Sequence, residues 1–183
     1  KAGGAQAIAA LAFGTETIPK VHKIFGPGNK FVTEAKIQVS QAHGGAALDM
    51  PAGPSEVLVI AESNANAIFV ASDLLAQAEH DKDAHVILVT LSEDFASEIL
   101  SEIKRQSGYL SRFAIIEESL KKSSIIIADN LDEAFAISNR YAPEHLILHI
   151  ANAKDKLDLV QNAGSIFVGQ YSPESIGDYA SGT

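Results

Sequence analysis

Two short stretches of the sequence hold side chains that are able to do chemistry together. Gln77 and His80 lie three residues apart at the end of a helical pattern, so they share one face. A neutral imidazole is a good zinc ligand and an amide oxygen an uncommon one, but most such helix ends are simply polar termini. Glu144 and His145 follow Pro143 where a helical pattern stops and a strand begins. If irregular backbone turns both side chains toward one pocket, they can act as an acid–base pair. If the backbone is a regular strand, they point to opposite faces and are simply a surface Glu and a His at the edge of the core.

Two glycine-containing segments are further candidates for ligand binding. Asp178 offers a hard oxygen ligand in a glycine-flanked loop, or else caps a turn. Residues 26–29 read Gly-Pro-Gly-Asn between a strand pattern and a helix, where backbone N–H groups favour a phosphate. Phe31 stands where a dinucleotide fingerprint has its third glycine. A tight turn with Asn29 as helix N-cap is therefore the favoured interpretation.

The elements that must position these side chains alternate between strand and helix, which predicts an α/β fold with a mostly parallel sheet. Runs rich in Val and Ile predict strands at residues 21–25, 56–61, 85–90, 124–128, 145–150 and 165–168. Amphipathic stretches predict helices at residues 5–13, 29–41, 66–78, 93–106, 131–141 and 154–162. Ligands of such sheets bind beyond the carboxyl ends of the strands, so we expect the site there.

Residues 42–55 are the least regular part of the chain and are punctuated by Gly and Pro. We place a domain boundary near Pro54, which divides the chain into residues 1–54 and 55–183. We predict that both parts are incomplete Rossmann-like domains, in a three-layer α/β/α arrangement.

The bulk composition excludes several classes of function. The 183 residues are 46% apolar and carry a formal net charge of −9, which disfavours binding to nucleic acid or to an acidic membrane. No apolar run approaches the ~20 residues of a membrane span. The absence of cysteine removes disulfides, thiolate zinc sites and a cysteine nucleophile. Small molecules and proteins remain as partners.

Taken in order, the motifs of this chain closely resemble those of the histidinol dehydrogenases. The resemblance covers the whole length of the chain, and six motifs in sequence are more specific than any one of them. The matching stretches are residues 3–15, 21–36, 49–56, 77–80, 143–146 and 172–182.

The resemblance implies oxidation of L-histidinol to L-histidine through L-histidinal, with reduction of two NAD, in a cytoplasmic enzyme with one zinc ion per subunit. Glu144 and His145 would be the acid–base pair, and Gln6 and Asn29 would bind NAD, which places NAD binding in residues 1–54. The implied zinc ligands are Gln77, His80 and Asp178. The implied histidinol contacts are Ser55, Gln77, His80, His145 and Asp178.

The resemblance also implies a homodimer whose partner subunit completes the site with a fourth zinc ligand, a His, and a substrate-binding Glu from beyond Thr183. A tyrosine of the NAD site would precede Lys1. We therefore expect this stretch alone to be inactive and to bind zinc weakly. Two alternatives stay open: a related dehydrogenase acting on another amino alcohol, and a non-catalytic α/β module that binds a metabolite.

Overall fold

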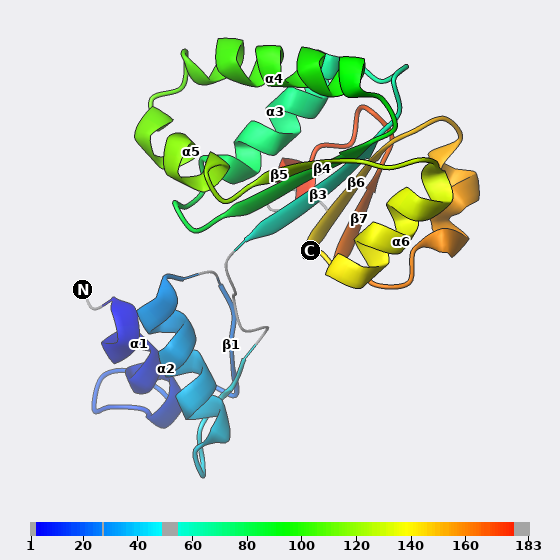
Figure 1. Ribbon diagram of the computed structural model, residues 1–183. Coiled ribbons are helices and arrows are strands. Elements are labelled where there is room, and N and C mark those ends of the chain that lie inside the picture. The colour runs from blue at the N-terminus through cyan, green and yellow to red at the C-terminus, as the bar shows by residue number, and fades with distance from the viewer. Residues whose placement is uncertain (1–2, 27, 49–54, 178–183) are drawn as a thin grey trace. The chain divides into compact units, whose positions relative to one another are not determined.

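The computed structural model describes residues 3–26, 28–48 and 55–177, and the chain divides into two compact units, Lys1–Gly53 and Pro54–Thr183. Each unit has a sheet of its own (Figure 1). The division derived from the sequence was residues 1–54 and 55–183. The assignment of NAD binding to the first unit, and of the zinc ligands and acid–base pair to the second, stays a prediction.

The first unit is small and packs two helices against a short parallel strand pair. Its elements are α1 (Gly4–Phe13), β1 (Lys23–Ile24), α2 (Lys30–Gln41) and β2 (Ala47–Leu48), with β1 beside β2. Asn29 is the N-cap of α2, as the sequence favoured, because its side-chain oxygen accepts hydrogen bonds from the backbone N–H groups of Phe31 and Val32. β2 was not predicted, since two residues are too short to show a strand period.

The second unit is a three-layer α/β/α sandwich around a five-stranded parallel sheet. Its strands are β3 (Glu56–Ala61), β4 (His85–Thr90), β5 (Ser124–Ile127), β6 (His145–His149) and β7 (Ser165–Val168), in the order β5-β4-β3-β6-β7. Its helices are α3 (Ala67–Ala78), α4 (Glu93–Ser107), α5 (Phe113–Leu120), α6 (Leu131–Tyr141) and the 3-10 helix η1 (Ala153–Leu159). This strand order is the 3-2-1-4-5 order of doubly wound sheets. The α/β prediction is thus confirmed.

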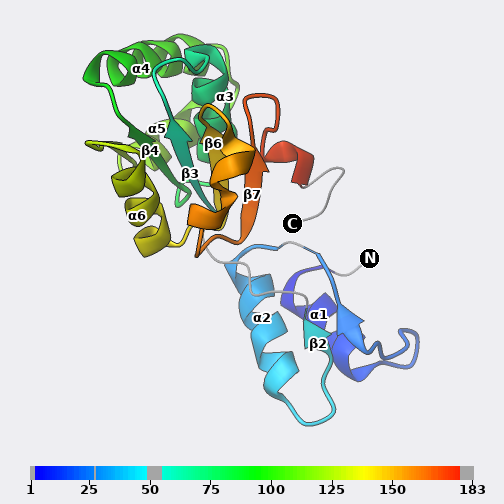
Figure 2. The ribbon, with the colours of Figure 1, turned by 90° about the vertical axis from the view of Figure 1, so that its right-hand side faces the viewer.

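Both faces of the sheet are buried, which is why its strands read as nearly continuous apolar runs. Alternate strand residues such as Val57 and Ile147 pack with α3, α4 and α5, whereas Leu58 and Leu146 belong to the core on the α6 side. Figures 1 and 2 show these helices on opposite faces of the sheet.

Two elements differ from the sequence-based expectation. The helix predicted at residues 154–162 is the 3-10 helix η1, in which charged residues interrupt the apolar spacing that an α-helix needs. α5 was not predicted, because its eight residues are shorter than the window in which a helical period can be recognised.

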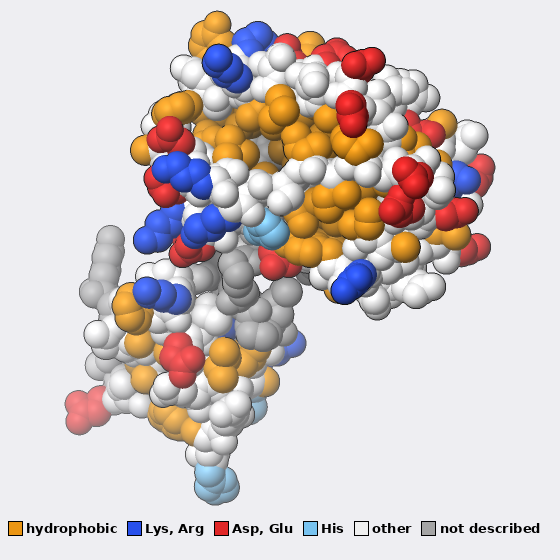
Figure 3. All heavy atoms as spheres, in the orientation of Figure 1, with side chains coloured by type: hydrophobic (Ala, Val, Ile, Leu, Met, Phe, Trp, Pro, Cys, Tyr) orange, Lys and Arg blue, Asp and Glu red, His pale blue; other side chains and the backbone are white. Residues whose placement is uncertain are grey.

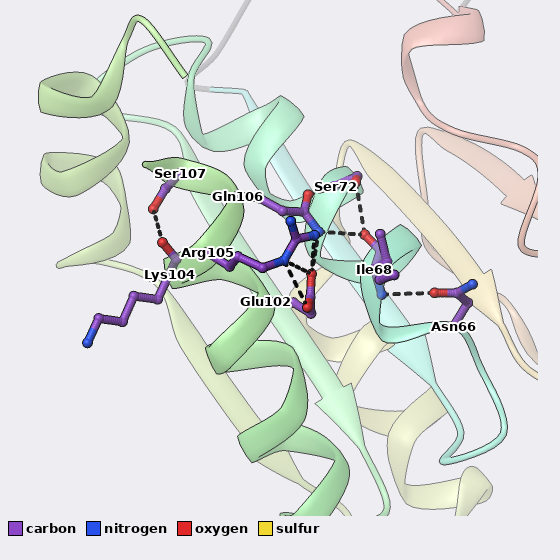
Figure 4. Close-up of polar contacts among 8 residues, drawn as sticks. All are labelled: Asn66, Ile68, Ser72, Glu102, Lys104, Arg105, Gln106 and Ser107. Carbon is purple, nitrogen blue, oxygen red and sulfur yellow. Dashed lines mark hydrogen bonds and ion pairs between the residues drawn. The ribbon is translucent and has the colours of Figure 1, made fainter. Parts of the chain in front are cut away.

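Polar contacts with α4 fix the first half of α3, the helix that carries Gln77 (Figure 4). The Gln106 amide donates a hydrogen bond of 3.0 Å to the carbonyl oxygen of Ile68, and Ser72 Oγ lies 2.9 Å from Gln106 Oε1. Asn66 caps α3 by accepting from the Ile68 backbone N–H. These contacts supplement the apolar packing between the two helices, so the direction of α3 is well defined.

The β5 edge of the sheet has no further strand beside it in the described ranges. Hydrophobic side chains gather on this face of the second unit in Figure 3, and Ile127 at the end of β5 is 42% exposed. Within the described ranges, no helix is both long enough and apolar enough to cross a membrane.

Candidate active site

Several of the residues proposed for chemistry lie at the amino-terminal edge of the five-stranded sheet. His145 is the first residue of β6, and Glu144 comes directly before it; Ser55 directly precedes β3. α3 returns between two parallel strands, so its carboxyl end, with Gln77, reaches the same edge. The expectation of a site at the carboxyl edge was therefore wrong. These side chains come from strand starts and a helix end, not from the turns that follow strands.

His145 lies in a nearly closed environment made by three other elements. The residue is 8% exposed, and its Nδ1 is 3.4 Å from the Gln77 side-chain oxygen on α3. Oε2 of Glu174, from the segment after β7, is 3.1 Å from the same nitrogen. The ring also packs edge-on against Phe167 of β7, with centroids 5.8 Å apart. An imidazole held in this way has a defined orientation, as proton transfer requires.

Glu144 is held mainly by backbone contacts. Its Oε2 accepts a hydrogen bond of 3.1 Å from the backbone N–H of Glu56, at the start of β3. Its own carbonyl accepts from Ser165 N–H at 2.8 Å, and Gly164 passes so close that a Cβ there would lie 2.6 Å from that carbonyl oxygen. Ala142, with a φ of 57°, supplies the irregular backbone before β6 that the sequence required. Glu144 and His145 are therefore not successive residues of one regular strand.

A second imidazole, His85, lies at the start of β4 on the same edge. Its Nδ1 is 2.6 Å from the hydroxyl of Tyr141, at the end of α6. Burial, followed by the charge and hydrogen bonding of Glu56, raises the pKa of Tyr141 to about 12. No partner for His85 could be recognised from the sequence, because Tyr141 lies 56 residues further along the chain.

The described zinc candidates differ sharply in exposure. Gln77 is 2% exposed, whereas His80 is exposed in the turn after α3. Asp178 lies outside the described residues. No group of three or more His, Cys, Asp or Glu side chains able to hold a metal exists within the described ranges. An amide oxygen and an imidazole suit zinc chemically, so the two described donors fit this metal, and zinc binding stays a prediction.

The remaining predicted ligands are not gathered with this group by any described contact. Gln6 lies exposed on α1, and Asn29 is exposed with its amide oxygen engaged in capping α2. Ser55 is partly buried, and its carbonyl accepts from His85 N–H at 3.1 Å. Glu174 was not singled out by sequence reasoning. Its motif, residues 172–175, was noticed, but nothing local reveals a contact with His145.

The opposite, carboxyl edge of the sheet holds a hollow of about 600 Å³. His149, the last residue of β6, is one of its lining residues, and its Nε2 is 2.7 Å from a carboxylate oxygen of Asp73 on α3. Both side chains are buried. The pair links α3 to β6 well away from the start of that strand.

The fold and this site define a protein of the α/β class, with the side chains predicted to transfer protons at one edge of a parallel sheet. Comparison with known proteins narrows the class. All 183 residues match the family model described as histidinol dehydrogenase. The chain belongs to the histidinol dehydrogenase family, as its motifs predicted.

Individual relatives agree with this assignment. The chain is 62% identical over 181 residues to a histidinol dehydrogenase of Mannheimia succiniciproducens and 59% identical to one of Salmonella typhi. Each alignment covers 99% of this chain and 42% of the relative. The crystal structure of histidinol dehydrogenase from Elizabethkingia anophelis matches with a TM-score of 0.93 and 54% identity, over 100% of this chain and 42% of that one. The chain thus spans about 42% of the length of these relatives.

Proposed function

We propose that the protein containing this chain oxidises L-histidinol to L-histidine through L-histidinal, with two NAD reduced and one zinc ion bound per subunit. The observation that carries the proposal is the convergence of Gln77 and His145. The side-chain oxygen of Gln77 lies 3.4 Å from Nδ1 of His145, although the two residues are 68 positions apart in the chain. Glu144 directly precedes His145 in the chain. The relatives that match the chain bear the name of this activity.

His145 would act as the base in both oxidations. Its ring would take the proton from the substrate hydroxyl while the carbon that bears this hydroxyl transfers a hydride to the nicotinamide. In the second oxidation, it would take a proton from the hydrated aldehyde in the same way. Because the protein fixes the ring through Nδ1, the opposite nitrogen is the one that would exchange protons with substrate.

Glu144 would serve the hydration step between the two oxidations. One of its oxygens accepts the Glu56 N–H, which holds the carboxylate in place. The carboxylate would remove a proton from the water that adds to the aldehyde carbon. This route needs no covalent thiohemiacetal, and the chain has no cysteine to form one.

Gln77 and His80, with Asp178, would hold the zinc ion. When bound, zinc would keep the imidazole and amine of the substrate in position, and NAD would supply the hydride acceptor. Gln6 and Asn29 would contribute to NAD binding from the first unit. The proposal includes a cytoplasmic homodimer in which the partner subunit completes the site.

Substitution of His145 tests the proposal in a full-length histidinol dehydrogenase that contains this chain. His145→Asn is expected to lower kcat for histidinol by roughly 10²–10⁴-fold, the usual contribution of a general base. His43→Asn is a matched control, because His43 is exposed in the first unit. A folded, zinc-loaded His145→Asn enzyme with the kcat of the parent would contradict the assignment.

Activity on other amino alcohols with no activity on histidinol would favour the related-dehydrogenase alternative. Ligand binding without any turnover would favour the binding-module alternative.

A further inference from the structure

We propose that Glu174 is a positioning residue for His145: its carboxylate fixes the tautomer and orientation of the ring, so that Nε2 is the nitrogen that exchanges protons with substrate. The inference deepens the proposed function and rests on it, because a base is positioned only if His145 is the base. Glu174 itself would not take part in proton transfer.

The contact joins two buried ionisable side chains. Glu174 Oε2 and His145 Nδ1 are 3.1 Å apart, and each side chain is 10% exposed. Oε2 of Glu174 is fully buried and makes no hydrogen bond within the described ranges, so its 3.1 Å approach to His145 Nδ1 is an ion-pair contact. A buried carboxylate oxygen is costly without a donor, and His145 Nδ1, 3.1 Å away, is a donor within reach when it carries the proton.

The surroundings of Nδ1 determine which tautomer is stable. A carboxylate can only accept hydrogen bonds, and the Gln77 side-chain oxygen, 3.4 Å from the same nitrogen, is an acceptor as well. Two acceptors at Nδ1 favour a proton on that nitrogen, which leaves Nε2 unprotonated in the neutral ring. This is the division of roles in an Asp–His couple, where the carboxylate holds the imidazole in the productive tautomer.

Glu174 reaches His145 because the chain turns back after β7. β7 is parallel to β6, with Ser165 beside His145, so the end of β7 lies at the opposite edge of the sheet. The segment after β7 returns as a short helical turn, in which Gly177 N–H donates to the Glu174 carbonyl at 2.7 Å. Figure 2 shows this turn beside β7. Tyr171, earlier in the segment, packs against Phe69 of α3. The segment therefore has a defined path that delivers Glu174 to the ring.

The test compares two substitutions of Glu174 in the full-length, zinc-loaded enzyme. Glu174→Gln keeps the size of the side chain but can present an NH₂ group to Nδ1 and so permit the wrong tautomer. It is expected to lower kcat by about 10²–10⁴-fold, by analogy with amide replacement of the carboxylate in a catalytic triad. KM for histidinol is expected to stay within about threefold, because the substrate's own contacts remain. Glu174→Asp keeps an acceptor-only group and is expected to retain more activity than Glu174→Gln.

A double substitution shows whether Glu174 acts through His145. In a His145→Asn background, Glu174→Gln is expected to cause no further loss, because the ring that it positions is gone. Glu98→Gln on α4 is the matched control, since Glu98 is exposed, and it is expected to leave kcat unchanged. Zinc content is measured for every variant and is expected to equal that of the parent.

The proposal is overturned if folded Glu174→Gln keeps the parental kcat, if its loss adds fully to that of His145→Asn, or if it loses zinc while kcat per bound zinc is unchanged. If Glu174→Gln does not fold, the same kcat comparison is made with Glu174→Asp, alone and in the His145→Asn background. A kcat loss that disappears in the His145→Asn background supports the proposal, whereas no loss, or a loss that persists, overturns it. Failure of the proposed function is a separate result, because the parent enzyme would then give no NADH from histidinol.

Discussion

Replacing Gly164 by alanine moves the backbone that carries Glu144 without touching its side chain. An added Cβ would lie 2.6 Å from the Glu144 carbonyl oxygen and 3.4 Å from its carbonyl carbon and Cα. Ordinary contact begins at 3.4 Å, so the two backbone segments must separate by about 0.8 Å. A backbone oxygen cannot rotate away as the end of a flexible side chain can.

The displacement affects stability and activity by different amounts. Forcing one extra carbon into a tightly packed site costs about 1–3 kcal/mol of unfolding free energy. A misplacement of about 1 Å can cost roughly 10²-fold in rate, so a shift of this size is expected to lower kcat about tenfold or more. The Glu56 N–H bond to Glu144, 3.1 Å long, lies on the β3 side of β6, opposite Gly164, and is the contact whose geometry the shift is expected to change.

The assay is steady-state NADH formation from histidinol by the full-length enzyme, together with denaturant unfolding. Gly108→Ala is the matched control, because a Cβ there meets nothing nearer than 3.6 Å. Its effects are expected to stay within about 0.5 kcal/mol and twofold in kcat. If Gly164→Ala were destabilised as expected but kept the parental kcat, the position of Glu144 would not matter and the role assigned to it would be refuted.

Three further predictions concern the scaffold. Asp73→Ala removes one partner of the buried pair with His149 and is expected to lower the free energy of unfolding by about 3–5 kcal/mol in denaturant titrations; a change below about 1 kcal/mol would contradict the pairing. The Tyr141 phenol is expected to ionise near pH 12 in ultraviolet titration. Because folding raises this pKa, its contribution to stability is full below pH 10 and is lost as pH rises through about 12, and Tyr141→Phe should abolish that part of the pH dependence. Gln106→Ala is expected to cost about 1 kcal/mol through loss of its bond to α3, and an unchanged unfolding midpoint would count against it.

Much of the second unit could be predicted from local sequence. The strands at residues 56–61, 85–90 and 165–168 were predicted with their observed bounds, because strands buried on both faces are continuous runs of Val, Ile and other apolar residues. α6 was likewise predicted in full, from Leu131 to Tyr141. The elements that were missed or mistyped, β2, α5 and η1, are short, and their periodicity is too brief to identify them.

Sequence motifs could propose members of the candidate site but not its geometry. Motifs singled out Gln77 and His145, yet only the three-dimensional structure brings these residues together, from positions 68 apart in the chain. The contact of Glu174 with His145 depends on the path of the chain after β7, which leaves no local pattern. The edge of the sheet was predicted wrongly, since the rule for carboxyl ends concerns turns after strands, whereas His145 begins a strand and Glu144 directly precedes it.

The central claim is a four-electron oxidation of histidinol, and the yield of NADH from a limiting amount of histidinol tests it most directly. The measurement uses the full-length protein containing this chain, with zinc and excess NAD. Two NADH per histidinol is the expected result, and the NADH yield of Gly164→Ala can then be compared with it. One NADH would mean that the reaction stops at the aldehyde and would contradict the hydration step assigned to Glu144, and none would contradict the proposed function itself.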